Sequence, residues 1–263
     1  MRIFLLGGTK DSTNIIEHLK RNYDAHILTT TTTEYGARLA REAGSDDTIA
    51  RPLLKDEIVE ILKGDSYDIL IDATHPFAEH ITQTSATIAN ELKIPYIRFE
   101  RPSINLENID TSHIHYANSF DEAGKLIAHD FPKGNILHFA GANTMADIVK
   151  YVPVERFYPR ILKVESSIEK CNALEIDPNH IIPMTGAATK EENITLIEKY
   201  DASVMITKES GEIGGVIEKI EAANETDIAV IMIKRPEIEM LNKNDIVNDL
   251  KELDTKIKSF LKK

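Results

Sequence analysis

The sequence is poor in cysteine, in glycine and proline, and in long apolar segments. Its one cysteine among 263 residues, Cys171, cannot form an internal disulfide and cannot by itself build a zinc site. The 12 glycines and 10 prolines are too few for a collagenous or low-complexity chain. The N-terminal apolar run is too short for a signal peptide, and the longest clean apolar run, residues 228–233, is far shorter than a membrane span. We therefore expect a folded, cytoplasmic protein.

Basic residues are also scarce in this chain. The 31 Lys and Arg residues are outnumbered by 43 Asp and Glu residues, which gives a formal net charge of −12. Nucleic acid and anionic membranes are therefore disfavoured as partners, because binding either needs a basic surface that displaces counterions. A small anionic ligand needs only a local cluster of basic side chains or backbone N–H groups. The nine histidines show no spacing typical of metal ligands, so no metal site is expected.

Short β-branched runs alternate with amphipathic helical stretches along the chain. Apolar strands separated by helices of about ten to fifteen residues are typical of βαβ units and of a parallel sheet covered on both faces. The predicted strands are 3–6, 25–28, 67–71, 96–99, 135–139, 157–162, 180–184, 203–207 and 228–233, and the predicted helices are 13–21, 55–63, 81–92, 120–128, 191–199 and 213–223. The fold class is therefore predicted to be α/β with parallel sheets.

The polar, aperiodic stretch 101–118 is interpreted as a junction between two α/β units. After residue 242, apolar residues recur at steps of three and four, which predicts an amphipathic C-terminal helix that covers one face of the fold. We predict a first domain over residues 1–110, a second domain over 111–240, and a C-terminal helix within 241–263.

Gly7-Gly8-Thr9 follows the first predicted strand and opens a helix. Glycines let the backbone approach a phosphate, and a helix N-terminus supplies N–H donors and a positive dipole end. The full dinucleotide fingerprint G-x-G-x-x-G is absent, so a plain tight turn is an equally good interpretation.

Four threonines, Thr29, Thr30, Thr31 and Thr32, follow the core of the second predicted strand. An NAD-binding unit usually has a carboxylate at this position, which binds the ribose 2′-hydroxyl and repels a 2′-phosphate. Hydroxyls without a carboxylate favour NADP, although Glu34 lies close by and the plain alternative is a strand-forming run.

The segment Asp72-Ala73-Thr74-His75-Pro76-Phe77-Ala78 follows an apolar strand and precedes a helix. Polar groups crowded at the carboxyl end of a strand are well placed for a ligand. Because Pro76 restricts the backbone, His75 is expected on a stiff turn beside the nicotinamide, where it donates a proton or a hydrogen bond. The alternative is a capping Asp72 and a structural His75.

Two further strand ends carry basic residues. Arg98 and Glu100 lie on one side of the strand that ends near Arg101, and the arginines either form surface ion pairs or bind substrate carboxylates in a cleft. Lys208, Ser210 and Gly211 follow another strand in a glycine-rich turn. That turn is either a second anion site or a flexible loop.

Together these motifs resemble the precorrin-6A reductases of cobalamin biosynthesis, over nearly the whole chain up to Pro236. The most specific part is the 72–78 segment. The other matching stretches are Leu5-Leu6-Gly7-Gly8-Thr9, Thr33-Glu34-Tyr35-Gly36, Arg98-x-Glu100-Arg101-Pro102, Lys208-x-Ser210-Gly211 and Lys234-Arg235-Pro236. The second half departs from the pattern, since Ala140-Gly141-Ala142-Asn143 and Gly186-Ala187-Ala188-Thr189 match it only loosely.

The resemblance implies two Rossmann-like domains with a cleft between them, NADPH as hydride donor, and a corrinoid substrate. The implied reaction reduces one macrocycle double bond of precorrin-6A, or of its cobalt-bearing counterpart, to give the 6B form. The expected site residues are His75 and Lys208 for catalysis, Gly7, Gly8, Thr9, Thr29, Thr30, Thr31, Thr32, Asp72, Thr74 and Pro76 for the cofactor, and Arg98, Arg101, Ser210 and Gly211 for the substrate.

One alternative from a different class stays open, a two-unit nucleotide-binding or nucleotide-sensing protein without catalysis. A short-chain dehydrogenase is excluded because none of the eight tyrosines has Lys four residues later. The sequence does not determine the oligomeric state, the proton donor or whether the substrate carries cobalt.

Overall fold

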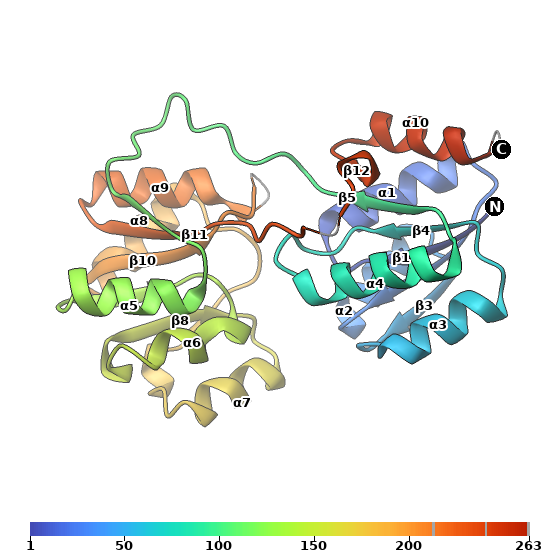
Figure 1. Ribbon diagram of the computed structural model, residues 1–263. Coiled ribbons are helices and arrows are strands. Elements are labelled where there is room, and N and C mark those ends of the chain that lie inside the picture. Colours follow the sequence, from blue (N-terminus) through green and yellow to red (C-terminus); the bar gives the residue numbers. More distant parts are fainter. Residues whose placement is uncertain (212–213, 240, 262–263) are drawn as a thin grey trace. The chain divides into compact units, whose positions relative to one another are not determined.

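A computed structural model describes residues 1–211, 214–239 and 241–261 (Figure 1). The chain divides into two compact units, one formed by Met1–Pro102 with Pro236–Lys263 and the other by Ser103–Arg235. Each unit contains a six-stranded sheet whose described strand pairs are all parallel. The predicted α/β fold class is therefore confirmed, while the cleft expected between the units stays a prediction.

The first unit has the strand order β12-β5-β4-β1-β2-β3. Its strands are β1 (Arg2–Leu6), β2 (His26–Thr31), β3 (Asp47–Ala50), β4 (Ile69–Asp72), β5 (Tyr96–Phe99) and β12 (Ile246–Val247), and its α-helices are α1 (Lys10–Asn22), α2 (Glu34–Glu42), α3 (Lys55–Gly64), α4 (Glu79–Leu92) and α10 (Leu250–Leu261). The strand order reverses between β1 and β4. In open parallel sheets, ligands bind at this switch point, outside the carboxyl ends of the strands.

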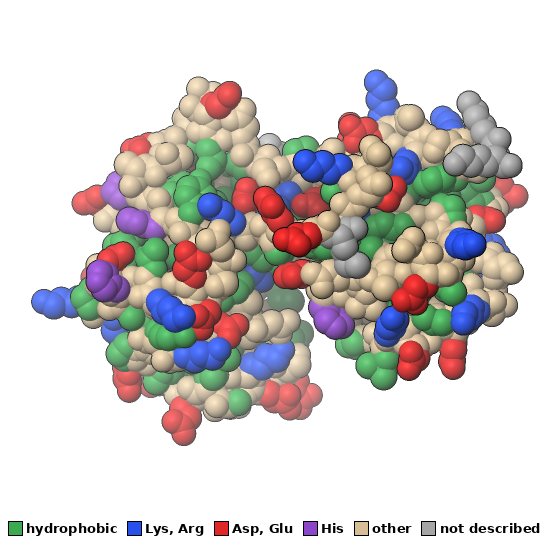
Figure 2. Space-filling view, viewed as in Figure 1, with side chains coloured by type: hydrophobic (Ala, Val, Ile, Leu, Met, Phe, Trp, Pro, Cys, Tyr) green, Lys and Arg blue, Asp and Glu red, His purple; other side chains and the backbone are tan. Residues whose placement is uncertain are grey.

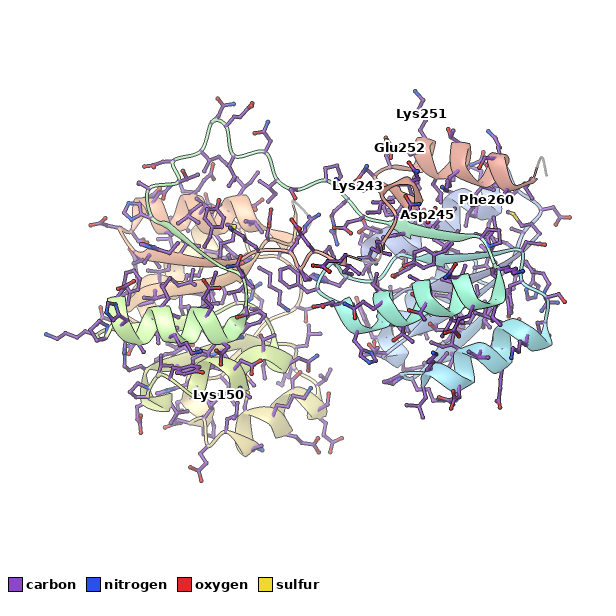
Figure 3. All side chains as sticks on the ribbon, viewed as in Figure 1. Lys150, Lys243, Asp245, Lys251, Glu252 and Phe260 are labelled. Carbon is purple, nitrogen blue, oxygen red and sulfur yellow. The ribbon has the colours of Figure 1, made fainter. Side chains whose placement is uncertain are left out.

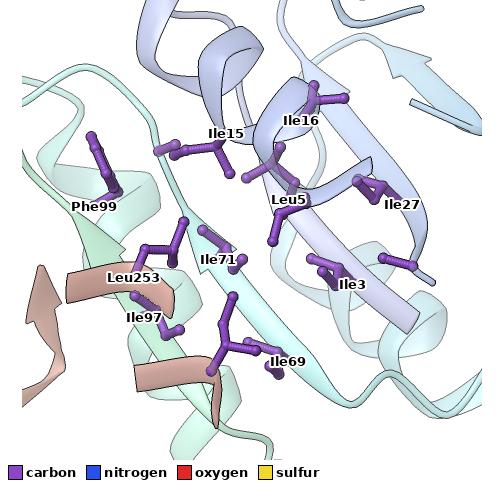
Figure 4. Close-up of a cluster of buried hydrophobic side chains, with 14 of the residues drawn as sticks. Ile3, Leu5, Ile15, Ile16, Ile27, Ile69, Ile71, Ile97, Phe99 and Leu253 are labelled. Carbon is purple, nitrogen blue, oxygen red and sulfur yellow. The ribbon is translucent and has the colours of Figure 1, made fainter. Parts of the chain in front are cut away.

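The strands of this sheet bury side chains on both faces. Ile3 and Leu5 pack with residues of α1 and with Leu253 of α10 on one face (Figure 4). Phe4 and Leu70 pack with residues of α3 and α4 on the other face. Burial on both faces explains why these strands appear in the sequence as continuous apolar runs.

The C-terminal segment completes the first unit. Strand β12 pairs in parallel with β5, so that Ile246 lies opposite Arg98. The Asn248 N–H donates to the Glu252 carboxylate at the start of α10 (2.8 Å), and Lys256 pairs with Asp245 (3.0 Å). Figure 3 labels Glu252 and Asp245 in this segment. The segment after residue 235 therefore belongs to the first unit, which it joins through β12 and α10. The predicted boundaries had instead placed residues up to 240 in the second domain.

Leu253 offers a direct test of this arrangement, because its side chain is fully buried against the sheet. Replacing it by alanine removes buried methyl groups and leaves a cavity, which typically costs about 2–5 kcal/mol of unfolding free energy. Leu261→Ala is a matched control, because Leu261 lies on the same helix and is 54% exposed. Denaturant unfolding should show a large loss for the first variant and almost none for the second. Equal, small losses would mean that α10 does not contribute to the core.

The second unit has the strand order β6-β11-β10-β7-β8-β9. Its strands are β6 (Ile114–Ala117), β7 (Asn135–His138), β8 (Phe157–Ile161), β9 (Ile182–Pro183), β10 (Ala202–Lys208) and β11 (Ala229–Ile233), and its α-helices are α5 (Phe120–Asp130), α6 (Met145–Val149), α7 (Glu165–Ala173), α8 (Lys190–Lys199) and α9 (Val216–Glu225). The core joins Leu137 and Met205 of the central strands to residues of α8 and α9.

Acidic and basic side chains are interspersed over the visible face of each unit (Figure 2). No α-helix among the described residues is long and apolar enough to cross a membrane.

Candidate functional site

The carboxyl ends of four adjacent strands of the first unit form a pocket of about 320 Å³. Its polar lining comes from Gly7, Gly8 and Thr9 after β1, from Thr30, Thr31 and Thr32 at the end of β2, from Arg51 after β3, and from Thr74, His75 and His80 after β4. Apolar lining comes from Leu6, Pro52, Leu53, Ile58, Ala78 and Ile81. Because neighbouring strands lie about 4.8 Å apart, the pocket edge from β4 to β3 extends over roughly 14 Å.

The turn between β1 and α1 brings bare glycine backbone to the pocket beside the start of α1. Gly8 has φ +97°, a left-handed conformation that favours glycine. A Cβ at Gly7 would lie 2.9 Å from Thr29 Cγ2, so a side chain there would clash. The bare backbone therefore forms the pocket surface where α1 begins.

The side chain of Thr9 caps α1, and its hydroxyl proton is used within the protein. Its Oγ1 accepts a hydrogen bond from Ser12 N–H (3.1 Å) and donates one to the Ala73 carbonyl (2.8 Å). The N–H groups of Gly8 and Thr9 both donate to Ser12 Oγ (3.1 Å each). The Gly7 N–H donates to the Thr30 carbonyl (2.8 Å). The anion-binding capacity of this turn therefore comes from the positive end of α1 and from the close approach that the bare glycines allow.

The four predicted threonines divide into two groups. Thr30, Thr31 and Thr32 line the pocket, whereas Thr29 is fully buried and its Oγ1 lies 2.7 Å from Ser45 Oγ. Thr29 is therefore a core residue and is removed from the set of direct cofactor ligands. The lining residues include no Asp or Glu.

Arg51 is a pocket residue that the sequence reasoning missed. It follows β3, is mostly exposed, and its Nη2 lies 2.6 Å from Glu57 Oε1. Strand β3 has four residues that are at most partly buried, so it lacks the apolar run by which a strand is recognised in a sequence. Because the strand was not predicted, the arginine after it was not placed at a strand end. By contrast Arg38, which the sequence places near the same threonines, pairs with Glu42 and does not line the pocket.

The turn after β4 lies beside the turn after β1, as predicted. Leu6 is opposite Asp72 in the parallel register, and the Ala73 N–H donates to the Leu6 carbonyl (2.9 Å). The Phe77 N–H donates to His75 Nδ1 (3.2 Å). In a neutral ring the proton is then on Nε2, so His75 offers a hydrogen-bond donor. Pro76 is buried behind this turn.

Asp72 and Arg98 form a buried ion pair below the same turn. Both side chains are fully buried, and Arg98 Nη1 lies 2.8 Å from Asp72 Oδ1. Neither residue lines the pocket. The expectation that Asp72 touches the cofactor and that Arg98 binds a substrate carboxylate is therefore wrong for direct contact, because neither side chain is accessible.

Arg101 is also engaged within the first unit. Its Nη2 lies 3.1 Å from Asp11 Oδ2 in the first turn of α1, and its side chain is 13% exposed. A role in substrate binding stays a prediction for this residue.

The carboxyl edge of the sheet in the second unit carries three basic side chains. Lys208 ends β10, Arg160 lies near the end of β8, and Lys219 lies in the first turn of α9. Burial lowers the pKa of Lys208 to about 8 and that of Lys219 to about 7, with Arg160 lowering the latter further. Burial also lowers the pKa of Arg160. Burial therefore disfavours the charged form of all three side chains, and an anionic ligand at this sheet edge would stabilise that form.

His138, at the end of β7 between β10 and β8, has a structural role at this edge. Burial lowers its pKa to about 3, so its ring is neutral. Its Nε2 lies 3.2 Å from the Gly141 carbonyl and 3.0 Å from Thr144 Oγ1, which fixes the loop after β7.

Ser210 and Gly211 form a buried turn directly after Lys208. The Ser210 N–H donates to the Lys208 carbonyl (2.8 Å), and Gly211 has φ +82°. A Cβ at Gly214 would overlap Ser210 Oγ, which explains the glycine there. Glu212 and Ile213 of the predicted glycine-rich motif, and hence the first residue of the predicted helix 213–223, lie outside the described residues.

These features define a class of protein: a two-unit Rossmann-like α/β protein with a glycine turn lining a pocket in one unit and buried basic residues at the sheet edge of the other. Residues 2–258 match the family described as precorrin-6x reductase CbiJ/CobK. The chain belongs to this family, and it is an oxidoreductase of the precorrin-6A reductase type.

Individual relatives agree with this assignment. The chain is 38% identical over 241 residues to a cobalt-precorrin-6A reductase of Methanothermobacter thermautotrophicus, which covers 91% of this chain and 78% of the relative. It is 39% identical over 241 residues to a protein of the same name from Methanocaldococcus jannaschii, covering 91% and 92%. A solved structure described as CobK precorrin-6A reductase has the same fold, with a TM-score of 0.75 at 17% identity over 99% of this chain and 97% of that one.

Proposed function

We propose that this protein reduces cobalt-precorrin-6A with NADPH. The observation that carries the proposal is the pocket across four strand ends of the first unit, with its bare glycine turn at the start of α1 and no carboxylate in its lining. The relatives whose names include the cobalt-bearing substrate support the choice of that form. The alternative of a non-catalytic nucleotide sensor has less support, because the family consists of reductases. The cytoplasmic location stays a prediction.

The residues of the first unit fit a nicotinamide dinucleotide. The N-terminus of α1 would hold its diphosphate, which the bare Gly7-Gly8 turn lets come close, Thr30 to Thr32 would lie near the adenosine ribose, and Thr74 and His75 would lie near the nicotinamide. When bound, NADPH supplies a hydride to an electron-poor carbon of the macrocycle. The work of the protein is then to orient the reactants and to keep water away from the reacting atoms.

The second unit would hold the substrate. A corrinoid precursor carries acetate and propionate groups, and Lys208, Arg160 and Lys219 are partly or fully buried basic residues that could form charge-assisted hydrogen bonds to these carboxylates. Lys208 also lies over the Phe120 ring, 5.4 Å from its centre. With a pKa near 8 it loses a proton at neutral pH more readily than an ordinary lysine, which makes it a better candidate than His75 for delivering the proton to the reduced macrocycle. Loss of Lys208 should therefore lower kcat as well as weaken substrate binding.

Arg51 is expected to give the protein its preference for NADPH over NADH. It is the guanidinium among the residues that line the pocket, at the β3 end next to the threonines of β2. Replacing Arg51 by alanine should reduce the NADPH/NADH preference in kcat/KM about tenfold or more, because a charge-assisted hydrogen bond is worth about 1.5–3 kcal/mol. The matched control is Arg38→Ala, which alters a nearby arginine outside the pocket. If Arg51→Ala keeps the parent's NADPH/NADH preference, Arg51 does not distinguish the two cofactors and the threonines of β2 alone do so.

His75 is expected to act as a hydrogen-bond donor and not as the general acid. The hydrogen bond that Nδ1 accepts from the Phe77 N–H would be lost if the ring became doubly protonated. His75→Gln retains an N–H donor, so it should keep most of the turnover, whereas His75→Ala should lower kcat roughly tenfold with NADPH binding retained. Equal losses in both variants, with a changed acid limb of the pH–rate profile, would instead favour proton donation by His75.

The proposed function is tested by mixing the protein anaerobically with NADPH and cobalt-precorrin-6A and following the nicotinamide absorbance. A reductase consumes NADPH in an amount equal to the macrocycle added. A sensor binds both molecules and leaves the absorbance unchanged, which would overturn the proposal.

A further inference from the structure

We propose that Arg98 is a positioning residue of the cofactor pocket: it fixes the Thr74 hydroxyl so that this oxygen accepts a hydrogen bond from a donor on the nicotinamide half of NADPH. The proposal rests on the NADPH site proposed above. It adds to that site a residue that does not line the pocket. Arg98 is the largest side chain among the fully buried residues of the described structure, and it reaches the pocket only through Asp72 and Thr74.

The Asp72 carboxylate collects four hydrogen bonds from its surroundings. Its Oδ1 accepts from the Thr74 N–H (2.9 Å), from the Thr74 hydroxyl (2.6 Å) and from Arg98 Nη1 (2.8 Å). Its Oδ2 accepts from the Tyr96 hydroxyl (3.0 Å). Burial raises the pKa of Tyr96 well above its usual value, with the charge of Asp72 as a further cause, so the phenol stays protonated and donates.

These bonds decide what the Thr74 hydroxyl can offer a ligand. A threonine hydroxyl ordinarily both donates and accepts. Here its proton is committed to Asp72, and one of its lone pairs accepts from Arg98 Nη1 (3.0 Å). Its remaining polar neighbour among the described residues is Thr82 Oγ1 at 3.4 Å, the outer limit of a hydrogen bond. Toward the pocket, Thr74 is therefore an acceptor.

The position of Thr74 indicates which part of the cofactor it would meet. It follows β4, on one side of the Gly7-Gly8 turn, and the threonines of β2 lie on the other side. If the glycine turn holds the diphosphate and the β2 side holds the adenosine, Thr74 lies on the nicotinamide side. That half carries two kinds of donor, the carboxamide N–H and the ribose hydroxyls, and either suits an acceptor.

Stability alone does not account for Arg98. A buried ion pair contributes little compared with apolar residues of similar volume, because both charges lose their hydration. Arg98 Nη2 has no hydrogen-bond partner among the described residues, which adds to that loss. The other contact of the guanidinium is Glu100, 3.4 Å from Nε. The arrangement is therefore better explained by the orientation that it imposes on Thr74.

The test measures NADPH binding without substrate, by fluorescence titration, in a double-mutant cycle. Thr74→Val removes the hydroxyl and Arg98→Met removes the guanidinium. Each is expected to weaken NADPH binding about tenfold, and the double variant is expected to be no weaker than the single ones, because both changes remove the same hydrogen bond. Thr74→Ser retains the hydroxyl and should bind like the parent. The proposal would be overturned if the double variant lost NADPH affinity by the product of the two single losses. It would also be overturned if Arg98→Met bound NADPH like the parent.

Two controls separate this result from other effects. Thermal unfolding of each variant identifies a purely structural role, and Arg98→Lys replaces Arg98→Met in the cycle if the latter does not fold. The 3-acetylpyridine analogue of NADPH lacks the carboxamide N–H, so a Thr74→Val loss that disappears with this analogue identifies the carboxamide as donor, and a loss that persists identifies a ribose hydroxyl. If the parent protein does not bind NADPH at all, the proposed function fails, which is distinct from failure of the cycle.

Discussion

Gly8→Asp is expected to weaken NADPH binding at least about 100-fold while the protein stays folded. The new carboxylate would stand where the diphosphate is proposed to bind, at the start of α1. Two like charges about 4 Å apart repel by about 4 kcal/mol at an effective dielectric constant of about 20, and every 1.4 kcal/mol is about a factor of ten in affinity. A side chain has room at this position, since a Cβ at Gly8 would have its nearest contact at 3.9 Å, Thr31 Cβ, but any residue other than glycine strains the backbone at φ +97°.

Gly8→Asn is the matched control for this experiment. Asparagine has nearly the same size as aspartate and faces the same φ of +97°, but it carries no charge. Titration of NADPH should therefore show a much smaller loss for asparagine than for aspartate, at similar melting temperatures. If the two variants lose affinity equally, the effect is steric and the turn does not hold an anion. If neither loses affinity, the pocket is not the cofactor site.

Lys208→Met is expected to raise the KM for the corrinoid about tenfold to a hundredfold and to leave NADPH binding unchanged. Methionine fills a similar volume without the charge, and one charge-assisted hydrogen bond is worth about 1.5–3 kcal/mol. Lys150→Met is the control, because Lys150 belongs to the same unit but is exposed and pairs with Asp147 (Figure 3). An unchanged KM in Lys208→Met would remove Lys208 from the substrate site.

The same residue predicts a pH dependence. Burial lowers the pKa of Lys208 to about 8, so its ammonium is charged below that pH and loses its charge as the pH rises through it. Affinity for a carboxylate substrate should therefore fall above about pH 8 in the parent protein. The Lys208→Met variant should have weak affinity on both sides of this range and a flatter profile. A parent profile in which affinity rises with pH would contradict the role of Lys208 as a cation.

The fold could be predicted because most strands are buried on both faces. Strands such as β1 and β11 consist almost wholly of apolar residues between polar turns, and all nine predicted strands have a counterpart in the structure. The three strands that were not predicted, β3, β6 and β12, are four, four and two residues long and partly buried. Strand β6 lies inside the stretch that was interpreted as a junction. Such short edge strands form because they pair with neighbouring strands, and no local sequence pattern encodes that pairing.

The helices that were missed have a similar explanation. Helix α2 has buried residues only at Ala37 and Ala40, α6 has only five residues, and α7 has few apolar positions. Small or scattered apolar residues give no clear period of 3.6.

The residues of the candidate site that stand at strand ends could be predicted from the sequence. The residues whose role depends on being buried could not. Gly7, Thr30 and Thr74 line the pocket because each follows or ends a parallel strand at one sheet edge. The sequence gives no sign that Arg98 is buried beneath that edge, because an arginine at a strand end is ordinarily exposed. Arg51 was missed together with β3. Lys219 was missed because its burial depends on the loop whose Gly214 carbonyl accepts from its Nζ (2.6 Å).

The central claim is that a hydride passes from NADPH to the corrinoid on this protein. The most direct test supplies NADPH deuterated at the transferable position of its nicotinamide ring and measures the mass of the reduced corrinoid. We expect one deuterium in each product molecule, and no deuterium when the label is placed on another carbon of the same nicotinamide ring. Product that forms without the label, or bound cofactor and corrinoid that do not react, would contradict the account.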